Sequence, residues 1–145
     1  MDTYTGEITV PRVLMYADCG TVMNPQLLQG QLMGSFNRGL GYAIYEDLPH
    51  DPKTGELMCK GLLVNYKTPT SYEMPSVENT KVIACDVYEP TGPFGAKGIG
   101  EAALASVSAA VGNAIYNAIG IRFTELPITP EKVLTAIKEQ GLANS

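Results

Sequence analysis

Apolar residues recur along this chain with two periods, and these periods predict its secondary structure. Stretches rich in β-branched and apolar residues predict three strands, at 7–18, 57–66 and 80–88. Pro11 cannot donate a ladder hydrogen bond, so the first strand is expected at a sheet edge or with a bulge. Apolar positions three and four residues apart predict three helices, at 25–45, 101–119 and 130–140. Strands and helices in this mixed order predict an α+β fold, and the length fits a single domain, 1–145.

Two of these helices begin with the same signal. Asn24-Pro25 and Thr129-Pro130 each combine an N-cap acceptor with proline at the first helical position. Gly120 is the expected C-terminal stop of the middle helix. That helix carries no charge between Glu101 and Arg122, so we expect it to be buried on most sides.

The helix predicted at 25–45 is unusual because it contains four glycines, at 30, 34, 39 and 41. Each costs about 0.8–1.0 kcal/mol relative to alanine, and together they cost roughly 3–4 kcal/mol. That is a large share of the net stability of a domain. Two explanations remain open: either another backbone packs closely against this helix, or a ligand does.

Composition and charge exclude several classes of protein. Hydrophobic residues make up 45% and charged residues 17%, which fits a folded globule rather than a disordered chain. The net charge is −5 with no basic run, so neither nucleic acid nor an anionic membrane surface is an expected partner. No apolar stretch approaches the roughly 20 residues that span a bilayer, and the first residues lack a secretion signal. We therefore expect a cytoplasmic protein.

The residues that commonly bind metals are few and scattered. His50 is the one histidine, and Cys19, Cys59 and Cys85 form no CxxC pair. The cysteines are expected to pack as small hydrophobic residues in a reducing compartment. We therefore predict no protein-ligated metal in this chain.

The segment 92–101 is the strongest candidate for chemistry. Its four glycines, at 92, 95, 98 and 100, leave exposed backbone N–H groups before a helix, which suits an anion or an electron-rich ligand. The spacing around Lys97 does not match a Walker phosphate loop. Residues 98–103 fit G-x-G-x-x-A, but no predicted strand directly precedes them, so we do not expect nucleotide binding.

Glu101 has two interpretations. An acidic residue in a first helical turn stabilises the helix dipole, and that explanation needs no chemistry. Alternatively, Glu101 is the one charge on an apolar helix, next to a glycine-rich loop. Burial would favour its protonated form, whereas the helix dipole and Lys97 would favour the carboxylate. A carboxylate balanced in this way can serve as a general base.

Three separated motifs cover nearly the whole chain. The first is Asp-Cys-Gly-Thr-Val-Met-Asn-Pro at 18–25, followed by Gly30-Gln31, Gly-Leu-Gly-Tyr-Ala at 39–43 and Glu46. The second is Gly-Ala-Lys-Gly-Ile-Gly-Glu at 95–101, and the third is Leu-Pro-Ile-Thr-Pro-Glu-Lys-Val-Leu at 126–134. In order and spacing they resemble the molybdenum hydroxylase family, which includes xanthine dehydrogenase and aldehyde oxidoreductase. Many members have proline after the motif glutamate, where this chain has Ala102.

The resemblance implies that the chain is the C-terminal part of a molybdenum-binding subunit. By that resemblance Glu101 is the general base. Gln31 and the loop backbone would lie against a molybdopterin-type cofactor, the loop residues being Gly95, Ala96, Lys97, Gly98, Ile99 and Gly100. Both glycine-rich segments would then allow backbone to approach the cofactor closely.

The resemblance also implies partners, because the family's catalytic subunit is several times longer. These are the remainder of that subunit, iron–sulfur domains or subunits and usually an FAD-containing one. The expected reaction is hydroxylation of an aldehyde or a purine-like N-heteroaromatic small molecule, with water as the oxygen source, and the isolated chain is expected to be inactive. The alternative is a non-catalytic assembly module that retains the fold, since its Ala-rich helix would expose apolar surface when alone.

Overall fold

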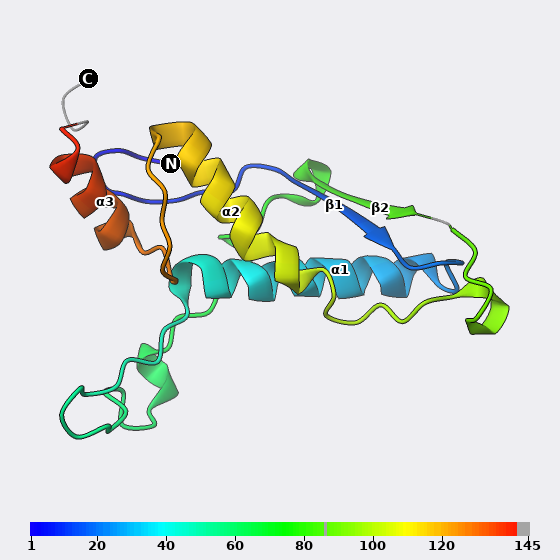
Figure 1. Cartoon of the computed structure of the whole chain (residues 1–145), viewed down its shortest axis with the longest axis horizontal. Helices are drawn as coiled ribbons and strands as arrows, with labels where there is room; N and C mark the ends of the chain where they lie inside the picture. Colours follow the sequence, from blue (N-terminus) through cyan, green and yellow to red (C-terminus); the bar gives the residue numbers. More distant parts are fainter. Residues whose placement is uncertain (86, 142–145) are drawn as a thin grey trace.

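The computed structural model describes residues 1–85 and 87–141, which form an elongated α+β arrangement (Figure 1). In chain order the strands and longer helices are β1 (Val13–Asp18), α1 (Pro25–Leu40), β2 (Thr80–Cys85), α2 (Leu104–Ile119) and α3 (Pro130–Glu139). A π-helical turn, Gly41–Tyr45, continues α1, and short 3-10 turns occupy Leu63–Asn65, Val77–Asn79 and Pro93–Gly95. The three predicted helices are therefore present, whereas the described residues form two strands instead of three.

The predicted capping residues position α1 and α3. The Asn24 side chain accepts a hydrogen bond from the Leu27 N–H at 3.0 Å, and the Thr129 hydroxyl accepts one from the Lys132 N–H at 3.3 Å. Gly120 ends α2 in the left-handed conformation, with φ of 72°. These helix ends form as predicted because each depends only on residues nearby in sequence.

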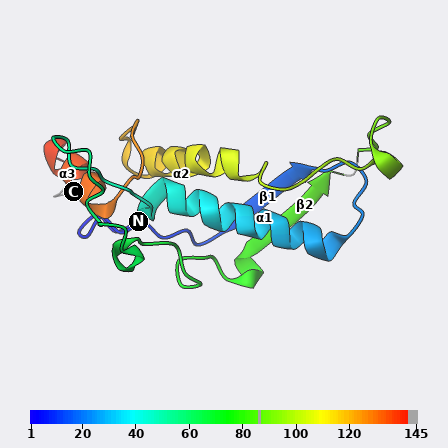
Figure 2. The same cartoon turned by 90° about the horizontal axis from the view of Figure 1, so that it is seen from below.

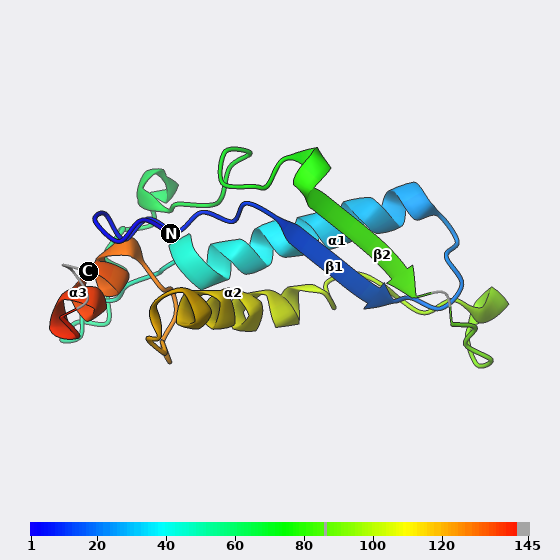
Figure 3. The same ribbon diagram turned by 90° about the horizontal axis from the view of Figure 1, so that it is seen from above.

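β1 and β2 form a two-stranded parallel sheet that lies across α1, with α2 beside β1 (Figures 2 and 3). The register runs from Val13 opposite Thr80 to Asp18 opposite Cys85. The first predicted strand is correct only in its second half, since the residues before Val13, Pro11 among them, lie outside the ladder. In the sequence β1 precedes α1 and β2 follows it, so the parallel pairing joins two segments that α1 separates.

The strand predicted at 57–66 is wrong. Lys60 and Gly61 have φ of 49° and 73°, which interrupts an extended backbone, and the chain forms turns there. Nearby apolar side chains have no sheet to pack against and are exposed, among them Met58, Leu62, Leu63 and Val64. β-propensity in this stretch is overridden because no neighbouring strand is present.

This stretch belongs to an arm, residues 46–66, that projects from the rest of the chain (Figure 1). The Tyr66 hydroxyl donates a 2.5 Å hydrogen bond to the Glu46 carboxylate, which brings the two ends of the arm together. The hydrogen bond to this negatively charged carboxylate stabilises the protonated phenol, so the pKa of Tyr66 rises to about 12.

The core lies between α1, α2 and β1 and extends to α3. Leu32, Leu40, Ile44, Ile128, Val133 and Ile137 are its most deeply buried large side chains. The expectation that the middle helix is buried on most sides is wrong for the described residues. α2 buries Val107, Val111 and Ile115 along one stripe, and most of its other positions are exposed.

The glycines of α1 and of the π-helical turn that continues it differ in their surroundings. A Cβ at Gly39 would collide with the Val107 side chain of α2, so this glycine allows the two helices to pack closely. A Cβ at Gly41 would collide with the Glu46 carboxylate. At Gly30 and Gly34 no neighbour lies within 4 Å of the place a Cβ would take, so close packing does not account for them. Within 1–85 and 87–141, no helix is long and apolar enough to cross a bilayer.

Candidate active site and cofactor groove

Two motifs far apart in sequence meet backbone against backbone. The Thr21 N–H donates to the Gly95 carbonyl oxygen at 2.8 Å, and the Lys97 N–H donates to the Cys19 carbonyl oxygen at 2.8 Å. Gly20 has φ of 62°, and a Cβ there would collide with the Gly95 carbonyl. The turn after β1 and the loop at 95–101 therefore form one structural unit, in which Gly20 permits the close approach.

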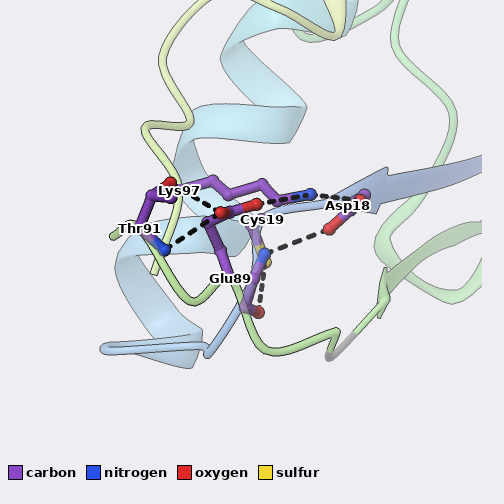
Figure 4. Close-up of polar contacts among 6 residues, drawn as sticks. Asp18, Cys19, Glu89, Thr91 and Lys97 are labelled. Carbon is purple, nitrogen blue, oxygen red and sulfur yellow. Dashed lines mark hydrogen bonds and ion pairs between the residues drawn. The ribbon is translucent and has the colours of Figure 1, made fainter. Parts of the chain in front are cut away.

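Lys97 stabilises this unit through its side chain (Figure 4). Its Nζ lies 2.7 Å from Asp18 Oδ2 and 4.0 Å from Glu89 Oε2. The hydrogen bond to Asp18 raises the pKa of Lys97, and the same contact lowers the pKa of Asp18. Glu89 is held in turn by the Thr91 hydroxyl, which donates to it at 2.6 Å. Lys97 thus pairs with Asp18 rather than with Glu101.

A groove of about 240 Å³ lies between the first half of α1 and this loop. Gln31 lines it from α1, and Ala96, Lys97 and Ile99 line it from the loop. Its remaining walls are Cys19, Thr21, Val22, Met23, Asn24, Leu27 and Leu28. We call this space the loop groove. It brings together Gln31 and three of the loop residues that the sequence predicts for cofactor binding.

The other predicted loop residues do not line the loop groove. Gly95 is buried against the Tyr88 ring. Gly98 and Gly100 are exposed, with open space where a Cβ would lie. Their backbone is therefore accessible to another molecule.

The loop runs alongside α1 in the same direction. The Ser35 hydroxyl donates to the Gly100 carbonyl oxygen at 3.2 Å, and Arg38 forms an ion pair with Glu101. Gln31, Ser35 and Arg38 are spaced by four and three residues, so they share one face of α1 over roughly 10 Å of helix rise. Gln31 and Glu101 are thus held at opposite ends of one strip of surface.

Glu101 does not occupy the environment expected from the sequence. Its side chain is 67% exposed, so burial does not favour its protonated form. α2 begins at Leu104 with Ala103 as its N-cap residue, and Glu101 therefore precedes the first helical turn. Arg38 is the cation beside it. Ser35 and Arg38 were missed in the sequence, although their helical spacing from Gln31 is the signal that identifies them.

The described part of the chain contains no group of three or more His, Cys, Asp or Glu side chains that could hold a metal ion. The candidate site comprises the Gln31 amide, the glycine-rich backbone of the loop and the Glu101 carboxylate paired with Arg38. In chemical terms it offers hydrogen-bond donors and acceptors to a polar ligand, with a proton acceptor at one end.

Comparison of the sequence with protein families identifies the class of protein to which this fold belongs. Residues 1–75 match the family described as molybdopterin cofactor-binding domain, and the chain belongs to this family. The resemblance inferred from the three motifs is thereby confirmed.

The similar proteins are molybdenum-containing oxidoreductases. The chain is 34% identical, over 94% of its length, to the putative xanthine dehydrogenase molybdenum-binding subunit of Escherichia coli K12. It is 37% identical, over 93% of its length, to the aldehyde oxidoreductase molybdenum-binding subunit of the same organism. The structure of aldehyde oxidoreductase from Desulfovibrio gigas superposes with a TM-score of 0.82 at 36% identity, covering 94% of this chain.

The chain is much shorter than these proteins. It spans 18% of each E. coli subunit and 14% of the D. gigas chain. The likeness therefore concerns one portion of a larger catalytic subunit.

Proposed function

We propose that this chain is the C-terminal, single-domain portion of the molybdenum-binding subunit of a hydroxylase. It contributes a cofactor groove and a general base to the oxidation of aldehydes or purine-like N-heteroaromatics, with water as the oxygen source. The single observation that carries the proposal is the arrangement along one face of α1. Gln31 lines the loop groove, Arg38 pairs with Glu101, and the loop at 96–101 lies alongside this face. We call this face, with Gln31, Ser35 and Arg38, the α1 strip. The family and the names of the similar proteins support the reaction class.

Gln31 and the exposed backbone of the loop are the groups of this chain that would hold a molybdopterin-type cofactor. Such a cofactor is polar and hydrogen-bonding, and the Gln31 amide can both donate and accept hydrogen bonds. Gly98 and Gly100 have no Cβ and open space beside them, so their backbone is accessible to such a group. When bound, the cofactor would supply the two-electron redox chemistry, and iron–sulfur and FAD groups elsewhere in the enzyme would carry the electrons away.

Glu101 is the residue that would move a proton. An exposed carboxylate is ionised at neutral pH and can accept a proton from the oxygen that attacks the substrate carbon. The Arg38 guanidinium now pairs with one of its oxygens, Oε1. Glu101 would therefore react through its second oxygen, or after this solvent-exposed pair opens.

The chain alone would not complete the site, because it spans less than a fifth of the length of the E. coli relatives. The test must use the complete enzyme that contains this chain. Glu101→Gln keeps the shape of the side chain and removes its proton affinity. We expect molybdenum content near that of the unmodified enzyme and a loss of turnover of at least about a hundredfold.

Glu125→Gln is the matched control, because Glu125 is also exposed and lies outside the loop groove and the α1 strip. It should leave turnover within about twofold. Near-normal turnover in Glu101→Gln would contradict the base assignment.

The second candidate is a non-catalytic assembly module. The observation that favours it is the exposed face of α2, which carries small and apolar residues. A complete enzyme whose molybdenum content and turnover are unaffected by any change in the loop groove would support this alternative.

A further inference from the structure

A second and larger groove lies between β1 and α2. Its volume is about 570 Å³. One wall is the extended segment from Ile8 to Asp18, and Phe36, Val107, Val111 and Ile115 lie at its apolar base. We call it the edge groove, because β1 presents one edge of the sheet to it.

The edge of β1 along this groove has no partner. β1 pairs with β2 on one side only, and the sheet in 1–85 and 87–141 has two strands. Among the described residues, no backbone hydrogen bond outside that ladder involves residues 8–17. In a parallel ladder alternate residues direct their N–H and C=O groups to opposite sides, so β1 leaves a row of these groups unpaired.

The sheet also has fewer strands and a more exposed face than parallel sheets ordinarily have. Parallel sheets are ordinarily covered on both faces and contain more than two strands. Here Leu14 and Tyr16, on the face opposite the buried Met15, are 62% and 67% exposed. Both features indicate that this sheet continues into another part of a larger structure.

The opposite wall of the edge groove has room for a strand with large side chains. Small residues line it at regular four-residue spacing, namely Ala102 just before α2 and Ser106, Ala110, Ala114 and Ala118 within it. Positions four apart lie one above another on a helix, so they form a shallow apolar surface without protruding groups. Among the described residues, the charged side chains that line the groove are Arg12, just before β1, and Asp18, at its end.

We propose that the edge groove receives an extended strand from the part of the molybdenum-binding subunit that this chain does not span. The strand pairs with the free edge of β1 and packs uncharged, apolar side chains against the small residues of α2. This inference rests on the proposed function, because the occupant is taken from that subunit. The length of the relatives supports it, since more than four fifths of each E. coli subunit lies outside the matched region.

Hydrogen–deuterium exchange tests the pairing directly. Exchange is compared between the isolated chain and the complete enzyme purified from its source cells. We expect amides within 8–18 to exchange at least tenfold more slowly in the complete enzyme, because a new strand would accept hydrogen bonds from the free edge. Cross-linking followed by peptide mass spectrometry then identifies the segment that lies in the groove.

A matched pair of variants tests the α2 wall. Ala110→Arg places a long cation inside the edge groove, whereas Ala109→Arg places the same side chain on an exposed position beside it that does not line the groove. We expect the recovery of assembled enzyme to fall at least tenfold for the first and to stay within about twofold for the second. Circular dichroism of both isolated variants checks that the chain still folds.

The outcomes separate this inference from the proposed function. Unchanged exchange at 8–18 in a molybdenum-containing, active enzyme would overturn the docking and leave the proposed function intact. A protected edge in an assembled complex that contains no molybdenum cofactor would support the docking and contradict the proposed function. A second copy of this chain in the groove, or equal effects of the two arginine variants, would overturn the assignment of the occupant.

Discussion

The Ser35 hydroxyl on α1 donates a hydrogen bond to the carbonyl oxygen of Gly100, 3.2 Å away and 65 residues later in the chain. Gly100 directly precedes Glu101, so this contact determines where Glu101 lies along α1. Ser35 is buried, and a buried hydroxyl needs a hydrogen-bond partner. The contact therefore both satisfies a polar group in the core and positions the candidate base.

Ser35→Ala should loosen the loop. The change removes one hydrogen bond that is worth about 1 kcal/mol, so denaturant unfolding of the isolated chain should show a loss of that order. Amides in 96–101 should exchange faster. Ser108→Ala on α2 is the control, and the prediction fails if the two variants lose equal stability.

The glycines of α1 should respond in opposite ways to alanine. Gly39→Ala should destabilise the isolated chain by about 1–3 kcal/mol, because its methyl group would collide with Val107. Gly34→Ala has open space and should stabilise the helix by up to about 1 kcal/mol. Thermal unfolding of both variants measures the difference.

The same two variants resolve why the helix tolerates its glycines. If a ligand lies against α1, Gly34→Ala should lower the cofactor content of the complete enzyme while raising the stability of the isolated chain. Unchanged cofactor content would show that Gly34 is not needed for a close approach.

The pair formed by Asp18 and Lys97 should give the loop a pH-dependent stability. The pKa of Asp18 is lowered in the folded chain, so its contribution is present above about pH 4 and is lost as pH falls through the lowered pKa. The pKa of Lys97 is raised, so its contribution persists at neutral pH and is lost only as pH rises through that raised value.

Lys97→Met tests this dependence through unfolding measured at several pH values. It should lower stability relative to the unmodified chain near pH 7, and the difference should shrink toward pH 2. The Asp18→Asn and double variants complete the cycle. A Lys97→Met deficit that is the same at pH 2 and pH 7 would contradict the pairing.

Removing the cation beside Glu101 should alter the turnover of the complete enzyme. Arg38 pairs with one carboxylate oxygen of Glu101, so Arg38→Met frees that oxygen and should change kcat/KM. The change should be under about tenfold, because both side chains are more than half exposed and solvent screens the pair. Arg122→Met is the control, since Arg122 pairs with Asn113 and stacks on Tyr116 instead.

The sequence was most informative where structure is local. The caps at Asn24 and Thr129 and the stop at Gly120 are correct, because each acts on residues within one helical turn. Motif resemblance also predicts that Gln31 and the loop at 95–100 belong to one site, and Gln31, Ala96, Lys97 and Ile99 line the loop groove together.

What the sequence did not reveal depends on contacts between distant segments. The exposure of Glu101 and its pairing with Arg38 follow from how the loop lies along α1. The predicted strand at 57–66 and the predicted burial of α2 are wrong for the same reason. Apolar residues predict burial, but they do not specify which part of a structure covers them.

The arm at 46–66 has a consequence for folding. Its ends meet at the hydrogen bond between Tyr66 and Glu46, and no residue inside it lines the loop groove or the edge groove. Replacing 47–65 by a short turn should therefore leave both grooves in place. The entropy cost of joining β2 to α1 would fall by roughly 0.5 kcal/mol, because a shorter loop has less freedom to lose. The shortened chain would also lose several exposed apolar side chains and become more soluble, so it is the form best suited to measurements on the isolated domain.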